Sequence, residues 1–175
     1  IAHAQKMVAI GSELVVIDNT GYIHLTDGES LFEASPELSA DIFMTLENTS
    51  SRGLLAGTDT GELIRLTVED DYLKYEESLC SYYSSVLAVA ESRDHNLWVA
   101  TNTQIDMIDN QGNHHPFFFD SFASAYTDIH EDYQGNIWIS SERYGVMLLL
   151  KTDFVNVNDK TVEGLRYKDK NIFRG

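Results

Sequence analysis

Four short β-rich segments recur along the chain at nearly constant spacing. Their central apolar residues follow one another at intervals of 40, 43 and 40 residues and are Val15, Leu55, Trp98 and Trp138. A repeat of about forty residues restricts the fold to architectures that use one small unit several times. Such a unit is too small to bury its own apolar face, so each copy must pack against a neighbour.

Each repeat predicts several short strands. An apolar strand ending in an acid precedes the central segment, and a turn rich in Gly, Asp, Asn or Thr follows it. In the last repeat these are residues 126–131 and 143–145, before a third strand at 146–150. A fourth, weaker strand closes each unit, most clearly at 113–119. Four short antiparallel strands per forty-odd residues are typical of a β-propeller blade, so we predict an all-β fold with about four blades.

The predicted blades span residues 1–41, 42–85, 86–125 and 126–160, and we interpret 161–175 as an exit loop and the start of a further blade. Four blades in a row leave two sheet faces without a neighbour. We therefore expect a section of a larger propeller, not a closed four-bladed ring. The remaining blades, or a second copy of the chain, would cover the two faces.

The four central residues are expected in the core. Trp98 and Trp138 occupy the same position in successive repeats, between apolar neighbours, so each ring should wedge between adjacent blades. A sugar-stacking platform is the alternative, because aromatic faces also bind carbohydrate. Equivalence across repeats favours core packing, with Val15 and Leu55 in the corresponding places.

The charge balance limits the partners. With 28 Asp and Glu against 12 Lys and Arg, the formal net charge is -16, and such a field repels phosphate backbones and anionic lipids. Nucleic acid is therefore not an expected partner. The chain also lacks any apolar stretch of eighteen residues, so a membrane anchor is expected outside it.

No residue pattern indicates a metal site or a cofactor. Cys80 is the only cysteine, which excludes an internal disulfide and a Cys-based zinc site. His114 and His115 are adjacent on a predicted strand and point to opposite faces. The loop 132–136 resembles an abbreviated calcium loop but lacks the acid at position twelve.

Nothing in the sequence predicts catalysis. There is no Gly-x-Ser-x-Gly elbow, no His-Glu-x-x-His helix and no Gly-rich phosphate loop. A propeller hydrolase or lyase would need converging acids or histidines, and only His130, Glu131 and Asp132 come close. We expect no enzyme activity and assign no catalytic residue.

The run Ile129-His130-Glu131-Asp132-Tyr133-Gln134-Gly135-Asn136-Ile137-Trp138-Ile139-Ser140-Ser141-Glu142-Arg143-Tyr144-Gly145-Val146 resembles the two-component regulator propeller repeat. That repeat reads acid-Asp-x-x-Gly-Asn-Leu-Trp-Ile-Gly-Thr, followed by a Gly-Leu step. Residues 91–101 match it with His95 in the glycine position, and residues 55–63 keep the Gly-Thr and Gly-Leu elements but replace Trp with Leu55. The resemblance covers roughly residues 7 to 160.

This resemblance implies a function. Proteins with the repeat are typically extracytoplasmic sensor portions of bacterial histidine kinases, hybrid two-component proteins or diguanylate cyclases, and their propellers close with about seven blades. The chain would then be an extracytoplasmic module of a membrane-anchored protein that senses a small molecule or glycan. The full-length protein would be a homodimer with its output domain outside this chain. A protein-interaction scaffold is the alternative.

Two aromatic and hydroxyl-rich segments, 81–85 and 120–126, precede the first strands of the third and fourth blades. In propellers of this family such loops lie at the mouth of the central channel. Aromatic rings mixed with hydroxyls suit a polar organic ligand such as a saccharide, although ordinary loop chemistry explains them nearly as well. The candidate ligand residues are Tyr82, Tyr83, Ser84, Ser121, Phe122 and Tyr126.

Overall fold

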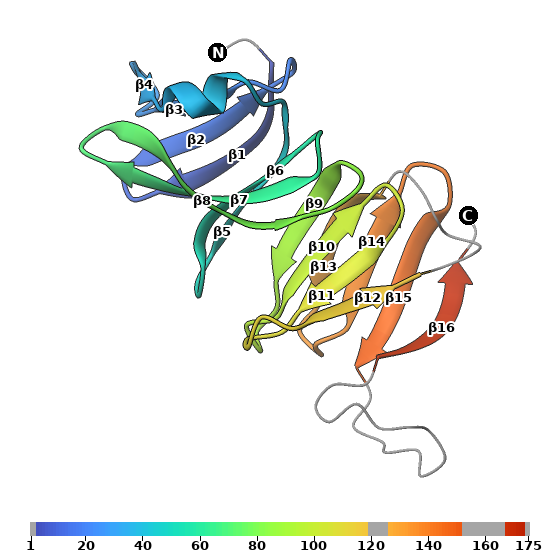
Figure 1. Cartoon of the computed structure of the whole chain (residues 1–175). Helices are drawn as coiled ribbons and strands as arrows, with labels where there is room; N and C mark the ends of the chain where they lie inside the picture. The colour runs from blue at the N-terminus through green and yellow to red at the C-terminus, as the bar shows by residue number, and fades with distance from the viewer. Residues whose placement is uncertain (1–2, 119–125, 152–166, 174–175) are drawn as a thin grey trace.

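The computed structural model describes residues 3–118, 126–151 and 167–173. Strands dominate these ranges, with one short 3-10 turn, η1 (Figure 1). The elements are β1 Ala4–Ile10, β2 Glu13–Asp18, β3 Ile23–Thr26, β4 Leu31–Ala34, η1 Pro36–Ser39, β5 Phe43–Thr49, β6 Gly53–Thr58, β7 Glu62–Glu69, β8 Tyr72–Ser81, β9 Val86–Glu91, β10 Leu97–Thr101, β11 Ile105–Ile108, β12 His114–Phe117, β13 Tyr126–Glu131, β14 Ile137–Ser141, β15 Gly145–Lys151 and β16 Tyr167–Phe173.

These strands form four blades of four antiparallel strands in chain order: β1–β4 (blade 1), β5–β8 (blade 2), β9–β12 (blade 3) and β13–β16 (blade 4). The predicted all-β, four-stranded organisation is therefore confirmed. Figure 1 shows the blades in an open row, from blade 1 in blue to blade 4 in orange. One expectation was wrong: β16 does not begin a further blade, because it pairs with β15 as the outer strand of blade 4.

In the first three repeats, the central residue is buried by the blade that follows. Val15 packs with Leu46 and Ile64 of blade 2, and Leu55 packs with Val89 and Val99 of blade 3. Both side chains are fully buried. Each blade therefore supplies one apolar face to its predecessor and the opposite face to its successor.

Trp98 follows the same rule. Its fully buried ring stacks on Phe117 of its own blade, with the ring centroids 5.7 Å apart. Blade 4 covers it with the row Ile129, Ile139 and Met147. The indole therefore fills the space between blades 3 and 4.

Trp138 departs from the predicted core, because 37% of its surface is exposed. No described strand lies on the face of blade 4 that carries it, so nothing covers the ring as blade 4 covers Trp98. Its indole nitrogen donates to Asp132 Oδ2 at 2.9 Å. The two tryptophans occupy equivalent positions in their blades, as the repeats predicted. Trp98 is buried because a following blade covers it, and no described strand covers Trp138 in the same way.

The acid at the end of the inner strand binds the preceding blade. The Glu91 carboxylate accepts hydrogen bonds from the backbone nitrogens of Ser50 and Ser51, at 2.6 and 3.1 Å, and from both hydroxyls. In return, Arg52 donates to the carbonyl of His95 at 2.8 Å. These bonds tie the β5–β6 turn of blade 2 to the β9–β10 turn of blade 3.

The same exchange recurs one blade later. Glu131 Oε2 accepts from the backbone nitrogen of Arg93 at 2.7 Å, and the Arg93 guanidinium donates to the Tyr133 carbonyl at 2.7 Å. Two of the acids that end the predicted strands, Glu91 and Glu131, therefore link neighbouring blades. Glu47, the third such acid, makes no comparable bond in the described residues.

His95 occupies the glycine position of the repeat and adopts the glycine conformation. Its φ is +61°, close to the +84° of Gly135 in the next repeat. A left-handed backbone costs a side-chain-bearing residue about 1–2 kcal/mol. The turn nevertheless keeps its shape, because its carbonyl is held by Arg52.

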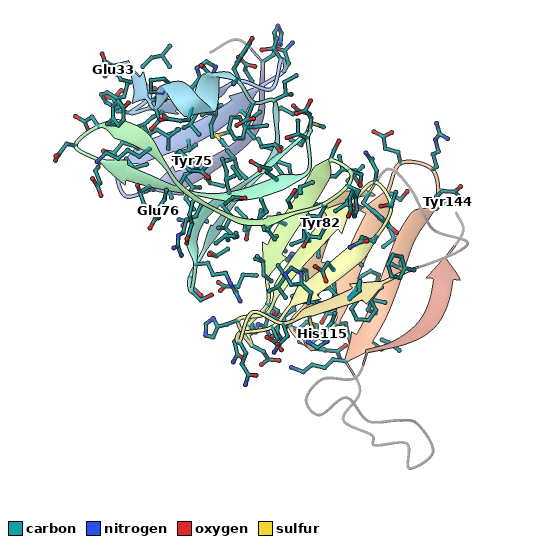
Figure 2. All side chains as sticks on the ribbon, viewed as in Figure 1. Glu33, Tyr75, Glu76, Tyr82, His115 and Tyr144 are labelled. Atoms are coloured by element: carbon teal, nitrogen blue, oxygen red, sulfur yellow. The ribbon has the colours of Figure 1, made fainter. Side chains whose placement is uncertain are left out.

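Blades 1 and 2 are also joined at their outer edges. β4 pairs with β8 in parallel, Glu33 opposite Tyr72 and Ala34 opposite Leu73, so the two blades form one eight-stranded sheet. The Ser35 backbone nitrogen continues this link by donating to the Leu73 carbonyl at 2.8 Å. Figure 2 labels Glu33 and Tyr75 on the two sides of the junction.

We predict that Trp98→Ala destabilises the protein by about 3–5 kcal/mol, because it empties a closed indole site. Trp138→Ala should cost only about 1–2 kcal/mol, since its ring is partly in water already. Urea unfolding of both variants measures the difference. Equal losses would mean that Trp138 is buried in solution.

The acids that end the predicted strands give a second, matched pair, because Glu91 links two blades and, in the described part of the chain, Glu47 does not. Glu91→Gln should destabilise by about 1–3 kcal/mol, because the amide cannot accept from all four donors. Glu47→Gln should be neutral or stabilising, since burial raises the pKa of Glu47 and its charged form is therefore penalised in the fold.

The pH dependence of stability should test the contacts of Glu91. Burial raises the pKa of Glu91, but the hydrogen bonds from Ser51 and Ser50 outweigh it, and the pKa lies below its ordinary value of 4.5. The stability that Glu91 adds is then complete above that value and lost as the pH falls through the lowered folded pKa. Unfolding curves of the wild type and Glu91→Gln should converge on acidification. A gap that widens instead would contradict this assignment.

Candidate functional site

The β8–β9 connection carries three of the predicted ligand residues, Tyr82, Tyr83 and Ser84, between blade 2 and blade 3. Figure 2 shows Tyr82 at this junction. Tyr83 is completely exposed, with a relative accessibility of 111%, whereas Tyr82 and Ser84 are half-buried. The connection therefore exposes the ring of Tyr83 to solvent, while the residues on either side of it are partly buried.

The turn between β6 and β7 holds this connection in place. Gly61 has a φ of +99°, and a Cβ there would lie 2.3 Å from the Tyr82 carbonyl oxygen and 2.8 Å from that of Ser84. The Tyr82 backbone nitrogen donates to the Gly61 carbonyl at 2.9 Å, and the Ser85 hydroxyl donates to the Asp59 carbonyl at 2.7 Å. Only glycine allows this close approach, so the repeat's Gly-Leu step positions the candidate site.

Beneath the connection lies a buried carboxylate that sequence reasoning missed. Asp106 on β11 is 1% exposed. Its Oδ2 accepts from the Tyr82 hydroxyl at 2.8 Å and lies 2.6 Å from His114 Nδ1. Because an ionised carboxylate can only accept, His114 Nδ1 is the donor in this pair. Asp106 Oδ1 is buried and has no partner among the described residues.

The sequence did contain a signal for Asp106. It interrupts the apolar strand Ile105–Ile108, of which all four residues are buried. A charged residue within such a strand must find partners, because an unpaired buried charge is strongly unfavourable. Those partners come from the β8–β9 connection (Tyr82) and from β12 (His114), so spacing along the chain could not identify them.

The chemistry of this cluster favours binding over nucleophilic attack. Cys80 lies beside it, but burial raises the pKa of the thiol and keeps it protonated. Burial also raises the pKa of Tyr82 well above its ordinary value. The cluster therefore offers neutral hydrogen-bonding groups and one paired carboxylate, not an activated nucleophile.

The other predicted ligand residues do not join the site. Tyr126 is only 2% exposed and packs in the core between blades 3 and 4, so its predicted role in ligand contact was wrong. Burial there raises its pKa to about 12. As the first residue of β13 it points into the blade interface. Ser121 and Phe122 lie outside the described residues.

The acids of the hydrolase alternative have structural partners. Glu131 binds Arg93, as described above, and Asp132 organises the β13–β14 turn by accepting from Gln134 and Asn136. Burial raises the pKa of Asp132, but its hydrogen bonds with Trp138 and Asn136 outweigh this and lower the pKa to about 2. Both carboxylates are therefore used to build the fold.

An ion pair joins the first strand of blade 1 to the first strand of blade 4. Lys6 Nζ on β1 lies 3.9 Å from Asp128 Oδ1 on β13, and the Lys6 charge favours ionisation of Glu47 on β5. Within the described part of the chain, no group of three or more His, Cys, Asp or Glu could hold a metal ion. No helix in the same ranges is long and apolar enough to cross a membrane.

Residues 121–143 match the family model described as two component regulator propeller. This stretch includes the run around Trp138 on which the resemblance rests, so residues 121–143 are similar to a repeat of that family. No curated protein matches the sequence.

Solved structures share the fold. The extracellular domain of the hybrid two component system BT3049 from B. thetaiotaomicron aligns with a TM-score of 0.64 and 19% identity, over 82% of this chain and 19% of that one. The extracellular domain of the one component system BT4673 from the same organism aligns with a TM-score of 0.61 and 15% identity, over 85% and 22%. The computationally designed protein Ika8 gives 0.59 and 14%, over 82% and 44%.

At such low identities the likeness concerns the fold alone. The chain spans about a fifth of the length of the two B. thetaiotaomicron domains, at 19% and 22%. The propeller architecture predicted from the repeats is thereby supported independently of the sequence motif.

We predict that Tyr82→Phe destabilises the protein by about 1–3 kcal/mol, because it removes a hydrogen-bond donor from buried Asp106. Tyr83→Phe, one residue along the same connection, should change stability by less than about 0.5 kcal/mol, as expected at an exposed position. Chemical denaturation of the two variants gives the comparison. An unchanged free energy of unfolding in Tyr82→Phe would show that the Tyr82 hydroxyl does not donate a stabilising hydrogen bond to Asp106.

Proposed function

We propose that this chain is part of an extracytoplasmic sensor propeller that binds a small polar ligand, a saccharide above all, and relays binding to an output domain outside the chain. The repeat at residues 121–143 supports a signalling role, because its family is named for two-component regulators. Location outside the cytoplasm is supported by the two neighbours described as extracellular domains.

The observation that carries the binding proposal is the presentation of Tyr83. Its ring is fully exposed, yet the connection that bears it is fixed by Gly61 and by the Tyr82–Asp106 hydrogen bond. An exposed aromatic on a rigid backbone loses little entropy when a ligand stacks on it. Nearby hydroxyls add hydrogen-bonding groups, with Ser84 Oγ lying 3.4 Å from Thr103 Oγ1.

The charge of the chain narrows the ligand class. A formal net charge of -16 disfavours sulfated or uronic polysaccharides, which would be repelled. Neutral sugars and amino sugars carry no such penalty. They also offer apolar C–H faces for Tyr83 and hydroxyls for Ser84.

The experiment is a binding screen of the whole chain against neutral, amino and sulfated oligosaccharides by saturation-transfer NMR. A neutral or amino sugar is expected to bind, and Tyr83→Ala should weaken it at least tenfold, or about 1.4 kcal/mol. Sulfated sugars should bind more weakly at low salt.

Tyr75→Ala is the matched control, since Tyr75 is also exposed, at 39%, but lies on β8 away from the connection. It should leave the affinity unchanged. Loss of binding in both variants, or binding that survives Tyr83→Ala, would remove the ligand site from this connection. A chain that binds none of these sugars would refute the saccharide assignment.

A protein-interaction scaffold remains the second candidate because of one observation. Blade 4 exposes Tyr133 at 81%, Trp138 at 37% and Val146 at 38%. Exposed aromatic and aliphatic residues gathered on one blade are typical of protein interfaces.

A further inference from the structure

The segment that carries Tyr83 lies beside two turns at the same end of the strands. Successive strands within blades 2 and 3 are antiparallel, so the β6–β7 turn, the β8–β9 connection and the β10–β11 turn share this end. The η1–β5 connection of blade 1 joins them, because the Asp59 backbone nitrogen donates to the Ile42 carbonyl at 2.9 Å. We call the four segments, residues 40–42, 59–61, 82–85 and 102–104, the connection end.

The connection end carries negative charge. Its four segments contain two carboxylates, Asp41 and Asp59, and no Lys, Arg or His. Beneath Tyr82 lies the carboxylate of Asp106, which is 1% exposed and whose Oδ1 has no partner among the described residues. His114 contacts only the other oxygen, Oδ2, at 2.6 Å. The potential at this end therefore favours a cationic ligand group.

Asp59 differs from the aspartates that build turns, because its carboxylate has no partner in the described residues. In the β2–β3 turn, Asp18 Oδ1 accepts from the Thr20 backbone nitrogen at 2.8 Å. In the β6–β7 turn, a hydroxyl takes this role: Thr58 Oγ1 accepts from the Glu62 backbone nitrogen at 2.9 Å. Asp59 follows Thr58, is exposed, and can accept from a donor outside the chain.

The backbone of Asp59 is nevertheless held on both sides. Its nitrogen donates to the Ile42 carbonyl, and its carbonyl accepts from the Ser85 hydroxyl at 2.7 Å. Two residues span at most about 7 Å, so the Tyr83 ring lies within the length of a short oligosaccharide from Asp59. A carboxylate on a fixed backbone loses little entropy when it binds a ligand. Ile42, 45% exposed, adds apolar surface on the other side.

We propose that Asp59 binds a protonated amine of the ligand, so that the saccharide sensed by this propeller is an amino sugar with a free amine. This inference rests on the saccharide site proposed at Tyr83. A carboxylate and an ammonium group form charge-assisted hydrogen bonds, which are roughly twice as strong as those between neutral groups. The face of the Tyr83 ring also attracts ammonium groups. An acetylated or neutral sugar offers neither contact.

The test is calorimetric titration of the whole chain with two oligosaccharides of equal length, one of glucosamine and one of N-acetylglucosamine. At about pH 6 the free amine is protonated. The glucosamine oligomer should bind at least about tenfold more tightly at low salt, and added salt should reduce this ratio by screening the charges. Asp59→Asn, which keeps the shape of the side chain, should lower the ratio to about threefold or less.

Glu29→Gln is the matched control. It removes the same charge from an exposed residue of the β3–β4 turn, at the opposite end of the strands. Its ratio of affinities should equal that of the wild type. Urea unfolding checks that Asp59→Asn is folded, and its midpoint should be unchanged because the carboxylate has no structural partner.

The outcomes separate this assignment from the proposed function. Equal affinities of the wild type for the two oligomers, with both weakened by Tyr83→Ala, would overturn the role of Asp59 and leave the saccharide site in place. A preference that survives Asp59→Asn, or that Glu29→Gln reduces equally, would assign it to Asp41 or to the overall charge and overturn the proposal. Binding of neither oligomer would overturn it as well, and the screen of neutral and sulfated sugars then decides whether the saccharide site stands.

Discussion

The structure depends on the burial of one side chain per repeat by the next blade. Val15, Leu55 and Trp98 are fully buried because blades 2, 3 and 4 cover them, whereas Trp138 keeps 37% of its surface in water. Burial of a large side chain contributes about 1.5–3 kcal/mol, and a single blade cannot obtain this alone. The order of the blades and their common orientation follow from this dependence.

Polar contacts then fix how neighbouring blades are aligned. Apolar packing is not directional. The carboxylates of Glu91 and Glu131, by contrast, accept hydrogen bonds from a turn of the preceding blade, between its first and second strands. In the opposite direction, Arg52 and Arg93 of the preceding blades donate to backbone carbonyls of the blades that follow. Gly61 adds a third constraint by holding the β8–β9 connection that presents Tyr83. The candidate site thus depends on the same turns that join the blades.

The repeats predicted strands and blades well, because alternation and turn residues act over a few positions. They could not show that Trp138 is exposed, since its sequence surroundings equal those of Trp98 and only the following blade differs. Asp106 was missed for a related reason: its partners Tyr82 and His114 come from other parts of the chain, the β8–β9 connection and β12. Tyr126 was assigned to the ligand although the predicted strand 126–131 already included it, and the sequence did not show that its side chain faces the neighbouring blade.

The outer-edge link between β4 and β8 has a consequence for how the molecule opens. It makes blades 1 and 2 a continuous sheet, so neither can separate without breaking backbone hydrogen bonds as well as the apolar contact. Blades 3 and 4 form separate sheets and are joined to their neighbours by packing and side chains. Protein regions open in cooperative units that follow such boundaries. The first two blades therefore form one unit whose amide protons exchange together, while blades 3 and 4 can open individually.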